Sequence, residues 1–203
     1  MKATLAVPVL LFVLLALIPA TPAAALNWAI GADLGFNVFM PSSDYVGAEN
    51  ISSFGWPQGS AVMGVLPGFG GLRISFVGEK PTHEVWLGTN LNFVSSEGSS
   101  FHVFDLNANY QYNFPTSGNI TPYATAGIGL DMVGASDGSS ISATSTVFGA
   151  GVGVAHHMGN GCGRLRAEVR FDGLTEGKDG DSIIIPKGSN LGIRLGFDLW
   201  DKK

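Results

Sequence analysis

The stretch Arg164-Leu165-Arg166-Ala167-Glu168-Val169-Arg170-Phe171-Asp172 alternates without a break between charged and apolar residues. Side chains on a β-strand point to opposite faces with a period of two. This segment, as a strand, therefore has one wholly apolar face and one wholly ionic face. A soluble sheet would bury the first and expose the second. The same alternation recurs along the chain, with charges on the face that carries glycines and amides, and this favours a barrel whose apolar face lies in lipid.

The N-terminal residues indicate export. Lys2 gives a basic start, residues 5–18 form an apolar run, and Ala23-Ala24-Ala25 supplies the small residues of a cleavage site. The apolar run is shorter than the roughly 20 residues that a spanning helix needs. We therefore predict that residues 1–25 are a cleaved signal peptide and that residues 26–203 form one outer-membrane β-barrel domain.

The composition excludes several classes of protein. Charged residues make up 13% of the chain and glycines number 29, a combination that disfavours helices. The net charge of -5 provides no basic surface for nucleic acid. Cys162 is the only cysteine, so no internal disulfide framework forms. The acidic loop Glu176 to Asp181 lacks the spacing of a calcium-binding loop, and we expect a solvated turn there, with no metal or cofactor.

Eight segments carry the period-two pattern of a strand. Their expected ranges are 27–39, 72–77, 83–94, 101–114, 121–132, 146–158, 164–172 and 190–199. The connections alternate between short turns and longer loops, and the longer ones cover 40–71, 95–100, 133–145 and 174–188. Residues 61–66 could form a short helix or an early start of the second strand. An even strand number with alternating loop lengths predicts the class all-β, an eight-stranded antiparallel up-and-down transmembrane β-barrel.

This pattern resembles the eight-stranded outer-membrane barrels of the OmpA/OmpX type. The resemblance covers almost the whole mature chain and is carried by the ranges 122–130, 148–153, 166–171 and 190–199. It implies a monomeric protein in the outer membrane of a Gram-negative bacterium, inserted by the barrel-assembly machinery and surrounded by lipid and lipopolysaccharide. The sequence departs from the family at its last outward position, where Leu199 replaces the usual aromatic residue. Phe197 could serve as the assembly signal instead.

The inward charges must pair, because the lumen of so small a barrel is filled by its own side chains. We predict an ion-pair network in which Arg166 and Arg170 bridge to carboxylates on neighbouring strands, such as Asp198 and Glu84. The network would seal the lumen, or leave at most a narrow gated pore. Its predicted members are Asp33, Arg73, Glu84, Asp105, Asp131, Arg166, Glu168, Arg170, Arg194 and Asp198, and Arg164 and Asp172 also face inward.

The sequence predicts a structural or surface-interacting barrel and no enzyme. Lipid A deacylases of this type use a His and a Ser close in sequence, but no His here is followed two residues later by Ser. A Ser-His-acid site could still assemble from distant residues, for instance with His102 beside Ser99 or Ser100. The alternatives are a small low-conductance pore, a lipid A-modifying membrane enzyme and a soluble periplasmic ligand-binding barrel. Four aromatic residues could contact a surface partner or belong to the aromatic girdle of the membrane interface: Tyr45, Phe54, Trp56 and Phe69.

Overall fold

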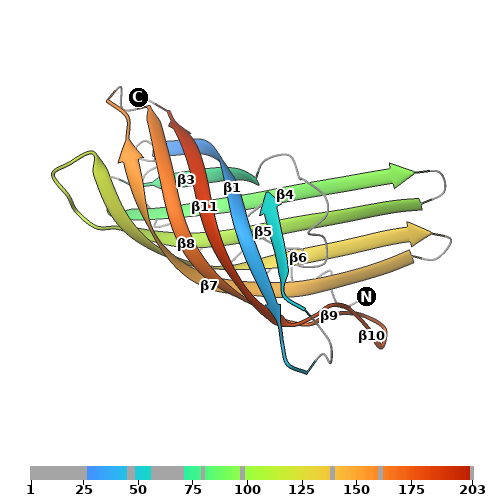
Figure 1. Ribbon diagram of the computed structural model, residues 1–203. Helices are drawn as coiled ribbons and strands as arrows, with labels where there is room; N and C mark the ends of the chain where they lie inside the picture. The colour runs from blue at the N-terminus through green and yellow to red at the C-terminus, as the bar shows by residue number, and fades with distance from the viewer. Residues whose placement is uncertain are drawn as a thin grey trace.

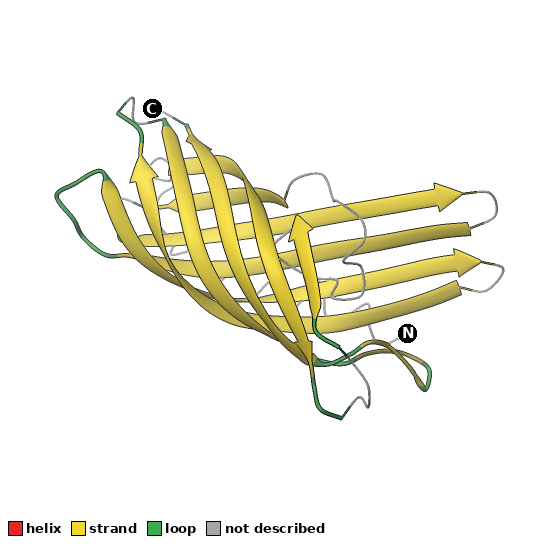
Figure 2. Ribbon diagram, viewed as in Figure 1, coloured by secondary structure: helices red, strands yellow, loops and turns green. Residues whose placement is uncertain are grey.

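The computed structural model describes residues 27–44, 49–55, 71–78, 81–96, 99–137, 140–159 and 162–201. The expected signal peptide and residues 61–66 lie outside these ranges, so both expectations stay predictions. Regular structure in the described ranges consists of strands alone (Figure 2). Across these ranges, no helix has the length and apolar character needed to cross a membrane.

Eight strands close into an antiparallel barrel, as the sequence predicts (Figure 1). Each strand pairs with the next around the wall, and β1 pairs with β11 from Ala29↔Trp200 to Pro41↔Gly188 to complete the closure. The predicted fold class is therefore confirmed. The eight strands are β1 (Asn27–Pro41), β3 (Gly71–Val77), β4 (His83–Ser96), β5 (Ser99–Asn113), β6 (Ile120–Asp137), β7 (Ser140–His157), β8 (Gly163–Leu174) and β11 (Gly188–Trp200).

A short additional strand, β2 (Ile51–Gly55), lies within the segment 40–71 that the sequence predicts to be irregular, so that prediction is wrong for these five residues. β3 pairs with β1 only over Asn27 to Asp33, and β2 takes the same side of β1 over Gly35 to Phe39. β2 thus pairs with the backbone groups of β1 that β3 does not reach, which would otherwise form an open strand edge.

Two hairpins are longer than predicted. β6 and β7 run for 18 residues each, so most of the predicted loop 133–145 is strand, and β4 and β5 likewise extend into the predicted loop 95–100. Figure 1 shows both hairpins projecting past the other strands. Ser140, Ile141 and Ser142 are all exposed, so the alternating burial stops near the tip of β7 and both of its faces meet solvent. We call this end of the barrel the loop end, and the end with Asn27 and Trp200 the terminal end.

The predicted solvated turn between β8 and β11 is instead a small hairpin of β9 (Gly177–Asp179) and β10 (Ser182–Ile185). Its two-residue turn begins at Gly180, whose φ of 58° lies in the left-handed region that glycine adopts without strain. The hairpin places Ile185 against three inward side chains near the loop end of the lumen. These are Val103 on β5, Val133 on β6 and Ala143 on β7.

The burial pattern shows that the inner face of the barrel wall is the buried one. Outward apolar side chains are widely exposed, with Leu195 at 61% and Val152 at 63%, whereas the inward Glu84 and Asp198 are completely buried. This is the inverse of a soluble protein, in which the apolar set would form the core. A soluble barrel with an apolar interior is therefore excluded, and the apolar surface has the composition that a lipid bilayer requires.

Candidate functional site: the charged lumen

The strand β8 presents all five of its charged residues to the lumen. The charged alternate positions from Arg164 to Asp172 are each 5% exposed or less, while Leu165, Val169 and Phe171 between them are exposed on the outer face. Because the period of the strand is two, the sequence alternation converts directly into one ionic row inside the barrel. The carboxylates that pair with this row come from β1, β4, β8 and β11.

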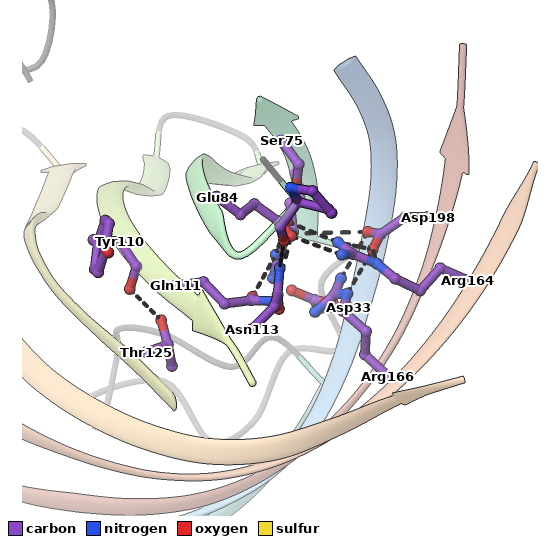
Figure 3. Close-up of polar contacts among 12 residues, drawn as sticks. Asp33, Ser75, Glu84, Tyr110, Gln111, Asn113, Thr125, Arg164, Arg166 and Asp198 are labelled. Atoms are coloured by element: carbon purple, nitrogen blue, oxygen red, sulfur yellow. Dashed lines mark hydrogen bonds and ion pairs between the residues drawn. The ribbon is translucent and has the colours of Figure 1, made fainter. Parts of the chain in front are cut away.

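The half of the lumen nearer the terminal end holds a cluster of three arginines and three carboxylates, shown in Figure 3. Arg164 binds both oxygens of Glu84, with Nη1–Oε2 and Nη2–Oε1 distances of 2.7 Å. Its Nε also donates to Asp198 Oδ2 at 2.8 Å. The two charge types are equal in number here, so the cluster is neutral as a unit. We call it the terminal cluster; its members are Asp33, Arg73, Glu84, Arg164, Arg166 and Asp198.

Arg166 links two strands of this cluster. Its Nε lies 2.7 Å from Asp198 Oδ2, and its Nη2 lies 2.9 Å from Asp198 Oδ1 and 2.6 Å from Asp33 Oδ1. Arg73 completes the unit, with its Nη2 2.7 Å from Glu84 Oε1. Charge-assisted bonds of this length and multiplicity fix the positions of the strands that carry them.

Aromatic and amide side chains surround the terminal cluster. The Arg73 guanidinium lies 4.2 Å from the ring centroid of Trp86, and that of Arg164 lies 4.8 Å from Trp200. Gln111 accepts from Arg73 at 3.0 Å and donates to Asn113 at 2.6 Å. The two ring contacts add cation–π attraction to the ion pairs, and Gln111 extends the hydrogen-bonded network to Asn113.

A second, smaller cluster lies further toward the loop end. Arg170 Nε contacts Asp172 Oδ1 at 2.5 Å, and Arg194 Nη2 contacts Asp172 Oδ2 at 3.2 Å. Arg194 also lies 3.8 Å from Glu168. Two arginines thus face two carboxylates. We call Glu168, Arg170, Asp172 and Arg194 the second cluster.

Inward glycines create the space for these long side chains. A methyl group at Gly196 would collide with Asp33 Oδ1 and with Arg166 Nη2, and one at Gly31 would collide with Asp198. On β7, a methyl group at Gly149 would collide with Asp172. The glycines and the charged network are therefore complementary in shape, which agrees with the narrow bore of an eight-stranded barrel.

The structure places all ten residues of the predicted network in the lumen but assigns partners differently in detail. Arg166 does contact Asp198, whereas Arg170 contacts Asp172 of its own strand and Glu84 is held by Arg164 and Arg73. Sequence reasoning placed Arg164 inward but gave it no partner, although it makes the bidentate contact. Partner choice depends on strand shear and side-chain reach, and neither is visible in a period-two pattern.

Two buried aromatic residues were not predicted to face inward. Trp86 is 2% exposed on β4 and Tyr123 is 1% exposed on β6. The signal was available, because each shares the parity of inward residues on its own strand, Glu84 and Thr125 respectively. Aromatic residues of a membrane barrel are usually expected in the girdle on its outer surface. Aromatic residues that fill the lumen are therefore easily overlooked.

The side chains of the four predicted surface aromatics lie outside the described part of the structure. Tyr45, Trp56 and Phe69 lie outside the described residues. Phe54 lies on β2, where its backbone is paired with Phe36, and its side chain is outside the described part. A surface contact through these residues therefore stays a prediction.

The histidine that could have served a catalytic site faces away from the carboxylates. His102 is exposed on β5 and points to the outer face, whereas Asp105, three residues further along the strand, is buried on the inner face. His83 instead contacts the hydroxyl of Tyr110 at 2.5 Å on the outer face, beside the ring of Tyr112. The described geometry therefore brings no acid to His102 from the lumen.

The two mouths of the lumen differ. At the terminal end a cavity of about 550 Å³ is bounded by residues that include His157, Trp200 and Arg164 of the terminal cluster. At the loop end Ile185 packs on inward apolar side chains of the neighbouring strands β5, β6 and β7. A solute entering from the terminal end would therefore meet a neutral, hydrogen-bonded plug.

Comparison with known proteins agrees with this architecture. The family model for the outer membrane protein beta-barrel domain matches residues 10–198. No curated protein matches the sequence. Among solved structures, Neisserial surface protein A is 16% identical, with 85% of this chain and 96% of that chain covered and a TM-score of 0.55. The N-terminal barrel of Pseudomonas aeruginosa OprF is 13% identical over 84% and 97% of the chains, at a TM-score of 0.45. The outer membrane enzyme PagL is 14% identical, with 83% of this chain and 99% of that chain covered and a TM-score of 0.34.

A closed antiparallel wall with an apolar exterior and a paired ionic interior defines a transmembrane β-barrel. The chain belongs to the outer membrane protein beta-barrel family. At these levels of sequence identity the similar structures establish the fold alone.

Proposed function

We propose that this protein is a closed, non-conducting barrel of the bacterial outer membrane that presents its loop end to the outside of the cell and catalyses no reaction. The observation that carries the proposal is the terminal cluster. Arg164, Glu84 and Asp198 meet across the lumen with contacts of 2.7–2.8 Å, and all three are almost completely buried. Buried ion pairs of this kind resist separation, because an isolated buried charge is costly.

The orientation follows from the connections. At the terminal end β3–β4, β5–β6 and β7–β8 are joined by short turns, whereas the loop end carries the projecting hairpins and the β9–β10 connection. Outer-membrane barrels keep short turns in the periplasm and longer loops outside. Export through a cleaved signal peptide, insertion by the barrel-assembly machinery, a monomeric state and a surround of lipid and lipopolysaccharide are parts of the same proposal. The lipid surround is supported by β11, where Leu195, Phe197 and Leu199 form an exposed apolar outward face.

Thiol labelling of intact cells tests this orientation. In a Cys162→Ser background, Ser142→Cys near the β7 tip should react with a membrane-impermeant maleimide. The matched control is Thr116→Cys in the short β5–β6 turn, where the residue is also exposed. It should react only after the outer membrane is permeabilised. Labelling of Thr116→Cys but not Ser142→Cys on intact cells would overturn the proposal.

A small low-conductance pore is the second candidate, and the cavity at the terminal mouth is the observation that favours it. Planar-bilayer recording separates the two. The closed barrel predicts no steady single-channel current from folded protein. A reproducible current that changes when Arg164 is replaced would support the pore, since Arg164 lines that cavity.

A further inference from the structure

The inward charges of the described residues do not balance. Seven carboxylates and five arginines are buried there, an excess of two negative charges. The terminal cluster pairs three arginines with three carboxylates, and the second cluster pairs two with two. The excess therefore resides on the remaining two carboxylates, Asp105 and Asp131.

These two carboxylates lie directly opposite each other. Asp105 on β5 is in register with Asp131 on β6, and their exposed fractions are 0% and 2%. Asn90 donates its Nδ2 to Asp105 Oδ2 at 2.9 Å. Asp105 Oδ1 and Asp131 Oδ2 are buried and accept no hydrogen bond from a donor group of the described residues, and the two carboxyl groups lie within hydrogen-bond reach of each other. Neither aspartate forms an ion pair with any described arginine, so the pair lacks the compensation that buried anions require.

The surroundings enclose the pair. The next inward positions toward the loop end are Val103 on β5 and Val133 on β6. Their side chains pack with Ile185 of the β9–β10 hairpin and form an apolar layer beside the pair. On the β4 side, Asp105 and Asn90 border a small cavity of about 20 Å³. That volume accommodates one water molecule or one ion. Across β7, the residue opposite Asp131 is Ser145, which is 1% exposed.

We propose that Asp105 and Asp131 bind one divalent cation with a preference for oxygen ligands, such as Ca²⁺ or Mg²⁺. A divalent ion cancels the excess of two charges, and the unpartnered oxygens Asp105 Oδ1 and Asp131 Oδ2 are its protein ligands. Sites with one or two carboxylates and retained water are typical of Mg²⁺, and Ca²⁺ also takes oxygen ligands. The described residues contain no cluster of three or more His, Cys, Asp or Glu, so the two aspartates are the charged ligands of this site, and water in the adjacent cavity completes the coordination.

The direct test is metal content. The folded protein is stripped with chelator in detergent, dialysed separately against Ca²⁺ and Mg²⁺, and analysed by elemental mass spectrometry and thermal unfolding. We expect about one ion per chain and a higher unfolding midpoint with the ion bound. Asp131→Asn should lose both effects. Asp181→Asn, which removes an exposed carboxylate from the β9–β10 turn, should retain both.

Two results would overturn the site. The first is wild-type protein that retains neither ion; an infrared band of a protonated carboxyl that disappears in Asp131→Asn would then show that a shared proton supplies the missing charge. The second is an ion that Asp131→Asn retains, which would place it elsewhere. If Asp131→Asn does not fold, Asp105→Asn/Asp131→Asn replaces it. That double variant carries no uncompensated charge, and its unfolding midpoint should be the same with chelator and with the ion.

Discussion

Arg166 is held by two carboxylates of different strands, Asp33 on β1 and Asp198 on β11. Asp198 has a second arginine in Arg164, but Asp33 has none among the described ion pairs. At the residue scale, stability therefore depends on which charge is left alone after a substitution. A buried carboxylate that pairs with two arginines tolerates the loss of one of them better than a carboxylate that pairs with a single arginine.

Arg166→Leu should lower the free energy of unfolding by about 3–5 kcal/mol, because Asp33 becomes an uncompensated buried charge. Urea denaturation of the barrel in detergent or lipid measures the effect. The double variant Arg166→Leu/Asp33→Leu should recover most of the loss, since it removes both charges. An unchanged midpoint in the single variant would contradict the network.

Gly196→Ala tests the close approach of the wall to the network. A methyl group there collides with Asp33 and Arg166, so the variant should lose about 1–3 kcal/mol of stability. Gly159→Ala is the matched control, because nothing lies within 4 Å of a methyl group at that position. Equal stability of the two variants would mean that the inward glycines do not make room for charged side chains.

The elements differ in how well their sequence predicts them. β8 and β11 alternate strictly between outward apolar and inward polar or small residues, and their predicted bounds lie within about two residues of the observed ones. The tips of β6 and β7 are rich in Gly, Ser and Ala, which resembles a loop, yet hairpin pairing extends through them from Ser136↔Ser140 downward. Both faces are solvated there, so no apolar alternation marks the strand. β2 spans only five residues, Ile51–Gly55, which is too short to carry a clear period-two pattern.

The network illustrates the same limit. Which residues face inward follows from parity alone, because a strand has two faces. Which arginine meets which carboxylate depends on the stagger between strands: Arg164 and Glu84 come from β8 and β4, which are not neighbours in the sheet. The sequence contains no local trace of that contact. The β9–β10 hairpin was likewise unpredicted, because its three- and four-residue strands are too short for a periodic pattern.

Within that hairpin, Ile185 and Ile183 have opposite environments and make a matched pair. Ile185 is 1% exposed against Val103 and Val133, whereas Ile183 is 45% exposed. Ile185→Ala should cost about 2–5 kcal/mol through lost burial and a residual cavity. Ile183→Ala should be close to neutral. Thermal unfolding of the two variants side by side measures the difference; similar midpoints would show that the hairpin does not cover the lumen.

At the scale of the whole molecule, stability requires lipid on the outside as well as ion pairs on the inside. Leu195 lies near the middle of β11 and is 61% exposed on the outer face, and Leu199 lies near its end. Leu195→Lys should cost about 2–4 kcal/mol in a bilayer, and Leu199→Lys about 0–1 kcal/mol, because the cost of a charge falls toward the interface. Equal costs at both positions, measured by unfolding from lipid vesicles, would contradict the membrane placement.

The most direct test of the barrel itself is gel electrophoresis of the protein from the outer-membrane fraction, heated against unheated. The eight-stranded closure through β1 and β11 predicts a compact, detergent-resistant species that migrates faster before boiling than after it. Recovery of the protein in the soluble periplasm, with no difference between heated and unheated samples, would contradict a closed barrel with its apolar face in lipid.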